Sequence, residues 1–364
     1  MALSNPPGEY DQAKEAKEFE DTMIGVKGLL DSGISTIPRF FIQPSKILST
    51  IRPSTTTIEI PVIDLSGIDN SFSGDSRSRI IDEIREASRR RGIFYIINHG
   101  IPDFILDNMI MAAKSFHEQP ADLRAQYYPG KLGSNAVFMT IYNFRVPTGA
   151  TWRDSLQVNW TPNPPELNQI PAVCREEMVA MDGYMKQLGK TLMELISEGL
   201  GVAPERLMEY MEDRLMLTHY YPYCPQPDLT LGTRPHTDST VLTVLLHNQN
   251  DEFQVECEQG WVHVMPLPGA LLVNIGDFLQ VLSNDEFKSV RHRVLANSSQ
   301  EPGITVAFLF LSSNTSKLCS PLPELVSPEK PPIYRSFKMH EHKQARYNIQ
   351  LEDEPRTALS YFKL

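Results

Sequence analysis

Several features that would assign this chain to a class at once are missing from its sequence. No apolar run approaches the roughly 18 residues that a membrane-spanning helix requires, so we expect no membrane partner. Residues 1–7 do not combine a basic segment with an apolar stretch, which argues against a secretory signal. We therefore expect a cytoplasmic protein.

Cysteine is scarce, and its spacing excludes two common roles. The four cysteines are Cys174, Cys224, Cys257 and Cys319, and no two of them are spaced as in a CxxC redox pair or a zinc site. In a cytoplasmic setting such thiols are expected to stay reduced, each buried or half-buried by itself.

Positive charge is also in short supply. The chain has 34 lysine and arginine residues against 45 aspartate and glutamate residues, a formal net charge of -11. A nucleic acid would have to bind against this overall field, so we expect no nucleic-acid partner. The 364 residues are 41% hydrophobic and 22% charged, which is typical of a soluble globular protein with a substantial core.

The first part of the chain has the pattern of helices with a few strands. Apolar residues at helical spacing predict helices over 9–30, 76–91, 102–117, 119–127, 173–200 and 204–213. Alternation predicts a strand over 58–65, and a short apolar run predicts a buried strand over 93–97. The methionine and leucine stripe of the long helix indicates packing in the core rather than a cofactor site.

From about residue 215 the pattern changes to short strands separated by turn residues. The predicted strands cover 215–221, 240–247, 253–257, 261–264, 270–274, 288–296 and 303–312. Regular short strands of this kind indicate a barrel or jelly roll. We predict a mostly β protein with flanking helices, divided into a mixed region (1–214) that packs on the core, a jelly-roll core (215–320) and a C-terminal extension (321–364).

Three side chains in the predicted core have the chemistry of a metal site. In an extended segment, residues two apart point to the same side, so His236 and Asp238 can present an imidazole and a carboxylate together. His292 begins another predicted strand, and the three would meet if the strands were neighbours. Two histidines and one carboxylate on one face of an octahedron form the site of non-haem Fe(II) oxygenases. A single His-x-Asp is common, however, and a lone histidine more often packs in the core.

The sequence around these residues resembles the plant 2-oxoglutarate- and Fe(II)-dependent dioxygenases. The resemblance rests on HYYPYCPQPDLTLGTRPHTDSTVLTVLL (219–246), on GWVHVMPLPGALLVNIGDFLQVLSNDEFKSVRHRVLANSSQEP (260–302) and on the C-terminal ALSYFKL. It is strongest to the branch of homologues of 1-aminocyclopropane-1-carboxylate oxidase, which includes alkaloid hydroxylases, and it covers almost the whole chain. It implies a double-stranded β-helix, or jelly-roll, core buttressed by helices.

The resemblance also implies roles for individual residues. His236, Asp238 and His292 match the iron ligands of the family, with O2 as co-substrate and ascorbate as a candidate reductant. Tyr221 matches a tyrosine that contacts 2-oxoglutarate, and Thr305 matches a serine that touches its far carboxylate.

Gly303 departs from the family pattern, because it stands where relatives have an arginine. That arginine meets the far carboxylate of 2-oxoglutarate with two charge-assisted hydrogen bonds, and glycine offers neither charge nor donor. Leaving a buried charge without its partner costs roughly 3–5 kcal/mol, which corresponds to a loss of affinity on the order of 100- to 1000-fold or more. We expect weak 2-oxoglutarate binding unless another cation reaches the site; the candidates are Arg234, Arg291, Arg293 and Lys317.

An apolar, aromatic wall is the expected binding surface for a small-molecule substrate. Along the last predicted strand, positions 303, 305, 307 and 309 should line the interior, since they share one side. The candidate wall residues are Phe138, Tyr142, Phe144, Trp152, Leu309 and Phe310, with Asn143 as a hydrogen-bonding group. Each of these residues alone is as easily explained by core packing, or by a turn in the case of Asn143.

The leading hypothesis is a monomeric iron oxidoreductase of plant specialised metabolism that hydroxylates, demethylates, desaturates or cyclises an apolar small molecule. Gly303 motivates a second hypothesis, a non-oxidative isomerase, cyclase or lyase on the same scaffold. The third is a catalytically degenerate binder of small molecules.

Overall fold

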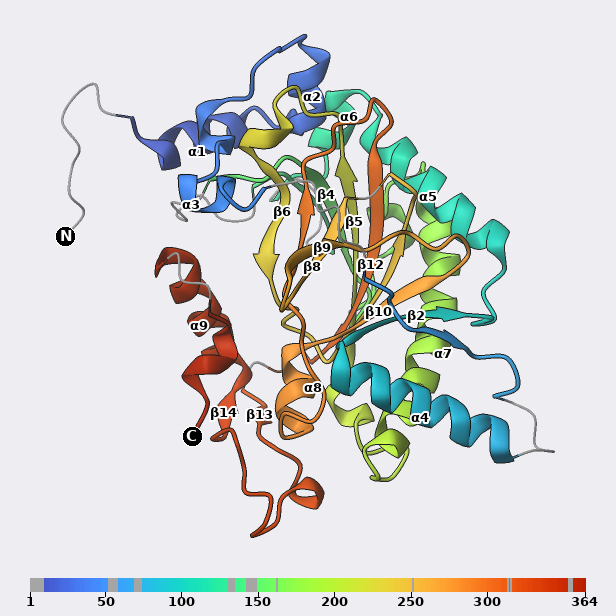
Figure 1. Ribbon diagram of the computed structural model, residues 1–364. Coiled ribbons are helices and arrows are strands. Elements are labelled where there is room, and N and C mark those ends of the chain that lie inside the picture. The colour runs from blue at the N-terminus through green and yellow to red at the C-terminus, as the bar shows by residue number, and fades with distance from the viewer. Residues whose placement is uncertain are drawn as a thin grey trace.

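Two β-sheets face each other at the centre of the protein, and helices cover the outer side of the larger one (Figure 1). The computed structural model describes residues 10–51, 58–68, 74–129, 135–141, 149–161, 163–250, 252–312, 314, 316–352 and 356–364. The larger sheet has eight strands in the order β1-β2-β10-β7-β12-β5-β4-β3, and the smaller has the order β6-β11-β8-β9. This is the predicted jelly-roll core with flanking helices.

Strands from both halves of the chain build the large sheet. Its strands are β1 (Val62–Asp64), β2 (Ile93–Ile97), β3 (Ala136–Met139), β4 (Asp154–Asn159), β5 (Asp213–Tyr221), β7 (Leu242–His247), β10 (Leu271–Ile275) and β12 (Gly303–Leu311). The small sheet consists of β6 (Leu231–His236), β8 (Phe253–Cys257), β9 (Gly260–His263) and β11 (His292–Leu295). A separate hairpin pairs β13 (Leu318–Cys319) with β14 (Phe337–Lys338). The region before residue 215 therefore extends the core sheet as well as packing on it.

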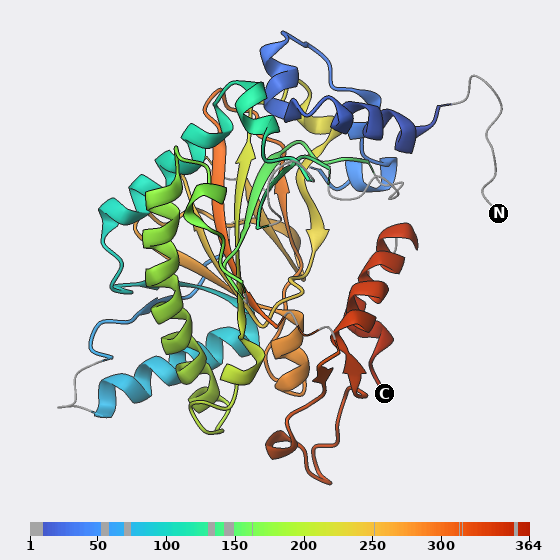
Figure 2. The ribbon, with the colours of Figure 1, turned by 180° about the vertical axis from the view of Figure 1, so that it is seen from behind.

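Helices α4, α5 and α7 form the layer behind the large sheet, as the view from behind shows (Figure 2). The α-helices are α1 (Gln12–Asp21), α2 (Gly25–Asp31), α3 (Ser45–Leu48), α4 (Gly74–Arg90), α5 (Asp103–His117), α6 (Ala121–Ala125), α7 (Arg175–Gly199), α8 (Asp277–Leu282) and α9 (Met339–Glu352). The methionine and leucine stripe of α7 is buried, as predicted. α9 lies on the opposite side of the protein, near the C-terminal end of β6 (Figure 1).

Three predicted elements in the first 214 residues differ from the structure. The helix expected over 204–213 is only the short 3-10 turn Met208–Tyr210. The helix expected over 9–30 is two helices, because Met23 and Gly25 have positive φ angles of 58° and 71° and break it. The strand expected over 58–65 is reduced to β1.

The two sides of β12 pack against different parts of the protein. Ile304, Val306, Phe308 and Phe310 belong to the large core that also contains the α5 and α7 side chains. Ala307 and Leu309 instead join the cluster between the two sheets, with Tyr221 and residues of the small sheet. The alternation predicted for this strand therefore holds, and both of its sides are covered.

A buried carboxylate joins the N-terminal segment to the core sheet. Asp154 of β4 accepts hydrogen bonds from the backbone N–H groups of Val26 (2.8 Å) and Lys27 (3.0 Å) at the start of α2, and from Thr140 (2.6 Å). The Arg124 guanidinium lies 3.6 Å away, and both charged side chains are fully buried. A Cβ at Gly25 would lie only 2.7 Å from the Asp154 oxygens, so this close approach requires glycine.

Free thiols and a mixed surface fit the composition. All four cysteines are free; Cys257 is half-buried and the other three are buried, as predicted.

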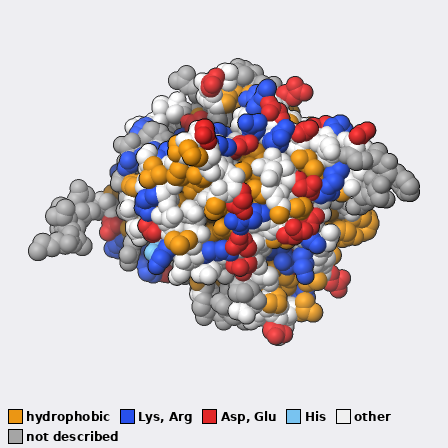
Figure 3. Space-filling view, turned by 90° about the horizontal axis from the view of Figure 1, so that it is seen from below, with side chains coloured by type: hydrophobic (Ala, Val, Ile, Leu, Met, Phe, Trp, Pro, Cys, Tyr) orange, Lys and Arg blue, Asp and Glu red, His pale blue; other side chains and the backbone are white. Residues whose placement is uncertain are grey.

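On the face shown in Figure 3, acidic and basic side chains are intermixed. Among the described residues, no helix combines the length and the apolar character needed to cross a membrane.

Candidate metal centre

His236, Asp238 and His292 come together at one end of the space between the sheets. β6 ends at His236, β11 begins at His292, and these two residues are direct partners in the antiparallel pairing of the two strands. Asp238 follows in the turn after β6. His236 lies outside the predicted strands, between 215–221 and 240–247, but in the structure it ends the separate strand β6. The irregular pairing of β6 with β11 near Pro235 conceals this strand in the sequence.

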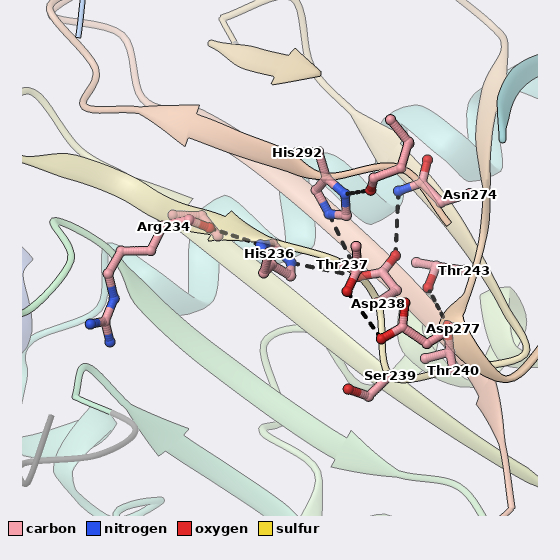
Figure 4. A network of polar contacts seen from close by, with 12 residues as sticks. Arg234, His236, Thr237, Asp238, Ser239, Thr240, Thr243, Asn274, Asp277 and His292 are labelled. Carbon is pink, nitrogen blue, oxygen red and sulfur yellow. Dashed lines mark hydrogen bonds and ion pairs between the residues drawn. The ribbon is translucent and has the colours of Figure 1, made fainter. Parts of the chain in front are cut away.

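The three side chains direct one ligand atom each toward a common point (Figure 4). Their ligand atoms lie within 4.8 Å of one another. Asp238 Oδ1 is 3.5 Å from the Nε2 atom of His236 and 3.5 Å from that of His292. The imidazole Nδ1–H of His236 donates to the carbonyl of Arg234 (2.8 Å), and that of His292 to the carbonyl of Val290 (3.1 Å). Since carbonyls only accept, both rings keep the lone pair of Nε2 for a metal.

The electrostatics of the cluster favour the protonation states that bind a cation. Burial, followed by the neighbouring His292, lowers the pKa of His236 to about 4, so this imidazole is neutral at neutral pH. Burial alone would raise the pKa of Asp238, but His292 and His236 outweigh it and hold the pKa well below its usual range. A neutral imidazole and an ionised carboxylate are the forms in which these groups ligate metals.

A buried network fixes the turn that carries the ligands. Asp277 Oδ2 accepts from Thr237 Oγ1 (3.0 Å) and lies 2.8 Å from Nε2 of His342 on α9. The Asp277 N–H donates to the Asp238 carbonyl at 2.8 Å. Arg346 of α9 donates to the Thr237 carbonyl at 3.1 Å. The C-terminal helix therefore holds the His-x-Asp turn from outside the sheets.

Replacing His342 with leucine should weaken iron binding without removing a ligand. The Asp277 carboxylate would lose its α9 partner, and we expect iron affinity to fall roughly 10- to 100-fold, as for other groups that orient metal ligands. His342→Gln, which keeps an N–H donor, should retain most of the affinity. The control is His340→Leu, at an exposed position of the same helix. Equal iron titrations for the two leucine variants would contradict this role of His342.

The residues expected to bind 2-oxoglutarate lie on adjacent strands of the large sheet. Tyr221 of β5 is the direct partner of Gly303 on β12, and Thr305 is the partner of His219. The Tyr221 hydroxyl lies 3.1 Å from Thr233 Oγ1 on the small sheet, and both Tyr221 and Thr305 are buried. The structure thus places the predicted co-substrate positions in the space between the sheets.

Position 303 has no room for a side chain. A Cβ built on Gly303 would lie 2.8 Å from the carbonyl oxygen of Asn250 and 3.4 Å from Tyr221 Cβ. Asn248 holds the Asn250 turn against β12, because its side chain bonds to the Ile304 N–H (2.9 Å) and to the Pro302 carbonyl (2.9 Å). The backbone of a neighbouring turn therefore closes this position.

Three of the four proposed substitute cations are engaged elsewhere. Arg291 pairs with Glu256 at 2.5 Å. Lys317 donates to the backbone carbonyl of Glu209 and lies 3.6 Å from the Glu212 carboxylate. Arg293 is fully buried, bonds to Gln254 and Thr50, and stacks over Trp261. Only Arg234, on β6, remains near the centre, and its side chain extends away from the three ligand groups (Figure 4).

The predicted substrate wall is partly incorrect. Phe138 and Phe310 face the helices, in the core with α5 and α7, and a Cβ at Gly189 of α7 would meet the Phe310 ring at 2.4 Å. Trp152 is fully buried against Phe41 in the N-terminal cluster. Leu309 does face the space between the sheets. Tyr142, Asn143 and Phe144 lie outside the described residues.

Four polar residues beside the site were missed from the sequence: His219, Ser155, Arg153 and Thr233. His219 on β5 shares a side of the sheet with Tyr221, and its Nδ1 lies 2.8 Å from Ser155 Oγ on β4. Burial, and then the charge of Arg153, lower the pKa of His219 well below its usual value. Arg153 donates to Thr233 Oγ1 at 2.6 Å. The i, i+2 spacing of His219 and Tyr221 was the signal that could have identified the histidine.

The fold and this site define the class of protein: a jelly-roll oxygenase with a candidate His-Asp-His metal centre. Residues 212–312 match the 2OG-Fe(II) oxygenase superfamily, and residues 60–174 match the N-terminal region described as non-haem dioxygenase in morphine synthesis. The chain belongs to the 2OG-Fe(II) oxygenase family of enzymes, whose cofactors are Fe(II) and 2-oxoglutarate. It is 40% identical to a 1-aminocyclopropane-1-carboxylate oxidase homolog of Solanum lycopersicum, over 98% of both chains.

Other similar proteins include enzymes and solved structures with bound ligands. The chain is 39% identical to deacetoxyvindoline 4-hydroxylase of Catharanthus roseus, over 98% of this chain and 90% of that one. The crystal structure of JOX2 in complex with 2OG, Fe and JA superimposes with a TM-score of 0.79 at 27% identity, covering 94% of this chain and 98% of that one. A dioxygenase for auxin oxidation in rice has the same fold, with a TM-score of 0.69 at 24% identity, over 84% and 100% of the two chains.

Proposed function

We propose that this protein is an Fe(II)-dependent oxidoreductase of plant specialised metabolism that oxidises an apolar small molecule by hydroxylation, demethylation, desaturation or ring formation. His236, Asp238 and His292 would hold the iron. The observation that carries the proposal is their convergence, with both Nε2 atoms 3.5 Å from the same carboxylate oxygen. The hydroxylase from Catharanthus roseus supports the reaction type and an alkaloid as one substrate class. A cytosolic location and a monomeric state stay predictions.

The bound iron would supply the oxidative chemistry, and the protein's own residues would orient the reactants and exclude water. Leu217, Leu245, Ala307 and Leu309 provide apolar surface in the cluster between the two sheets. Phe253 stacks on the His292 ring with centroids 5.2 Å apart, which restricts the ring's rotation. An apolar substrate would contact this surface and displace water from the metal.

We further infer that 2-oxoglutarate binds more weakly here than in relatives that carry arginine at the position of Gly303. Calorimetry on the iron-loaded protein under anaerobic conditions tests this, combined with measurement of succinate release after oxygen is admitted. We expect an affinity weaker than micromolar. A micromolar dissociation constant with one succinate released per turnover would refute the inference.

Introducing an arginine at position 303 should not produce tight binding of 2-oxoglutarate. Gly303→Arg must displace the Asn250 carbonyl, so we expect it to lower the free energy of unfolding by about 1–3 kcal/mol, as overpacking does, without a gain in 2-oxoglutarate affinity. Gly303→Ala is the matched control for the steric part. A Gly303→Arg protein with unchanged thermal stability and roughly 100-fold tighter binding would show instead that only the anchor was missing.

Gly303 also favours one alternative, a non-oxidative cyclase, isomerase or lyase on the same scaffold. The two functions differ in their need for oxygen. Incubating the protein with a panel of apolar plant metabolites, with and without oxygen and 2-oxoglutarate, separates them. Oxygen-independent product formation would support the alternative.

A further inference from the structure

Arg153 occupies the rim where the two sheets meet. The segment before β4 crosses from one sheet to the other: the Trp152 N–H donates to the Leu231 carbonyl of β6, while β4 itself pairs with β5. Since Asp154 is the partner of Tyr220, Arg153 falls opposite Tyr221 in the same register. It is half-buried, and its guanidinium donates to Thr233 Oγ1 at 2.6 Å.

This position puts Arg153 in line with the co-substrate residues. Gly303 on β12, Tyr221 on β5 and Arg153 before β4 follow one another across three neighbouring strands. Thr233 Oγ1 connects the last two, because it also lies 3.1 Å from the Tyr221 hydroxyl. A guanidinium is therefore present beside the tyrosine of this row, although the strand with Gly303 provides none.

The Arg153 guanidinium holds its charge in a partly buried place. Among the residues that the structure describes, no acidic side chain forms an ion pair with Arg153. Because a partly desolvated charge is unfavourable by itself, an anionic partner would stabilise it. Arg153 presents the fork geometry that suits a carboxylate.

We propose that Arg153, positioned by Thr233, binds a carboxylate of a ligand held beside the metal centre. The inference rests on the proposed function and adds that a ligand of this site carries a negatively charged carboxylate. Two molecules can supply that group: 2-oxoglutarate, whose far carboxylate lacks the usual anchor on β12, or an acidic substrate. In both cases Arg153 contacts the ligand and takes no part in bond breaking.

Two pairs of probes distinguish these sources on iron-loaded protein under anaerobic conditions. The first pair is 2-oxoglutarate and 2-oxopentanoate, which has the same carbon number and lacks the far carboxylate. The second is phenylacetate and its neutral amide, phenylacetamide, added after 2-oxoglutarate. In at least one pair we expect the parent to bind the probe that carries the tested carboxylate roughly 10- to 100-fold more tightly than the probe that lacks it. The pair that shows the preference identifies the source.

Variants at position 153 test whether this arginine causes the preference. Arg153→Gln should abolish it, Arg153→Lys should restore part of it, and Arg85→Gln, which removes an exposed arginine of α4, should leave it unchanged. If the parent has no preference in either pair, or if Arg153→Gln keeps the preference, the inference is wrong. Iron binding is measured in the same samples. Loss of iron from the parent would refute the proposed function itself, whereas iron binding without the carboxylate preference would refute the Arg153 inference alone.

Discussion

Replacing Asp238 with alanine should abolish iron binding and the oxygen-dependent reaction together. Asp238 Oδ1 is the atom that the Nε2 atoms of His236 and His292 both approach, at 3.5 Å each. Without the carboxylate, only the two imidazoles would remain of the three groups proposed to hold a divalent cation. We expect iron affinity to fall by more than the roughly 10- to 100-fold that loss of an orienting partner costs.

Asp82→Ala is the control for the Asp238 variant. Asp82 is an exposed carboxylate on α4 that pairs with Arg85, so the change removes the same charge far from the centre. Iron content by elemental analysis and circular dichroism should be recorded for both variants, so that unfolding is not mistaken for loss of a ligand. A folded Asp238→Ala protein that retains stoichiometric iron would remove the basis of the proposed function.

Asp154→Ala should produce the largest loss of stability of any single change considered. The substitution leaves the Arg124 guanidinium fully buried without its counter-charge and frees two N–H groups at the start of α2. Removing one partner of a buried ion pair typically costs about 3–5 kcal/mol, so chemical denaturation should reveal a loss of that size.

The double variant Arg124→Met with Asp154→Leu separates the two parts of the Asp154 effect. Replacing both buried charges by apolar groups should recover the part due to the lone arginine, but not the part due to the α2 backbone. Asp182→Ala is the comparison, because its pair with Arg214 is at 2.9 Å but partly exposed and should cost less. Equal losses for Asp154→Ala and Asp182→Ala would contradict the importance of burial.

Local patterns predicted the core strands and the histidine and carboxylate cluster. The side chains of an extended strand point alternately to its two sides, and this depends only on neighbouring residues. The sequence of 303–311 was therefore enough to predict which residues share a side of β12. The same reasoning could not tell which side faces the ligand, since Phe310 under α7 and Leu309 between the sheets are equally apolar. That ambiguity explains the incorrect placement of Phe138 and Phe310 in a substrate wall.

Residues whose roles depend on distant partners were the ones missed. Strand β6 was overlooked because its pairing with β11 is irregular between Thr233 and His236, which disturbs the alternation. Arg153 lies just outside β4, and only the crossing of Trp152 to β6 brings its guanidinium to Thr233. No pattern in the sequence indicates that the Asn250 carbonyl occupies the space that a side chain at position 303 would need.

The interleaved strand order has a consequence for how the protein is made on the ribosome. β2 pairs with β10, and β5 pairs with β12, which ends at Leu311. Neither of the earlier strands can form these pairs until the later strand has been synthesised. Until the synthesis of that strand is complete, the nascent chain displays unpaired strand edges, which are templates for aggregation. A polypeptide released before residue 311 should therefore be insoluble or bound to chaperones, because neither half can close the sheet by itself.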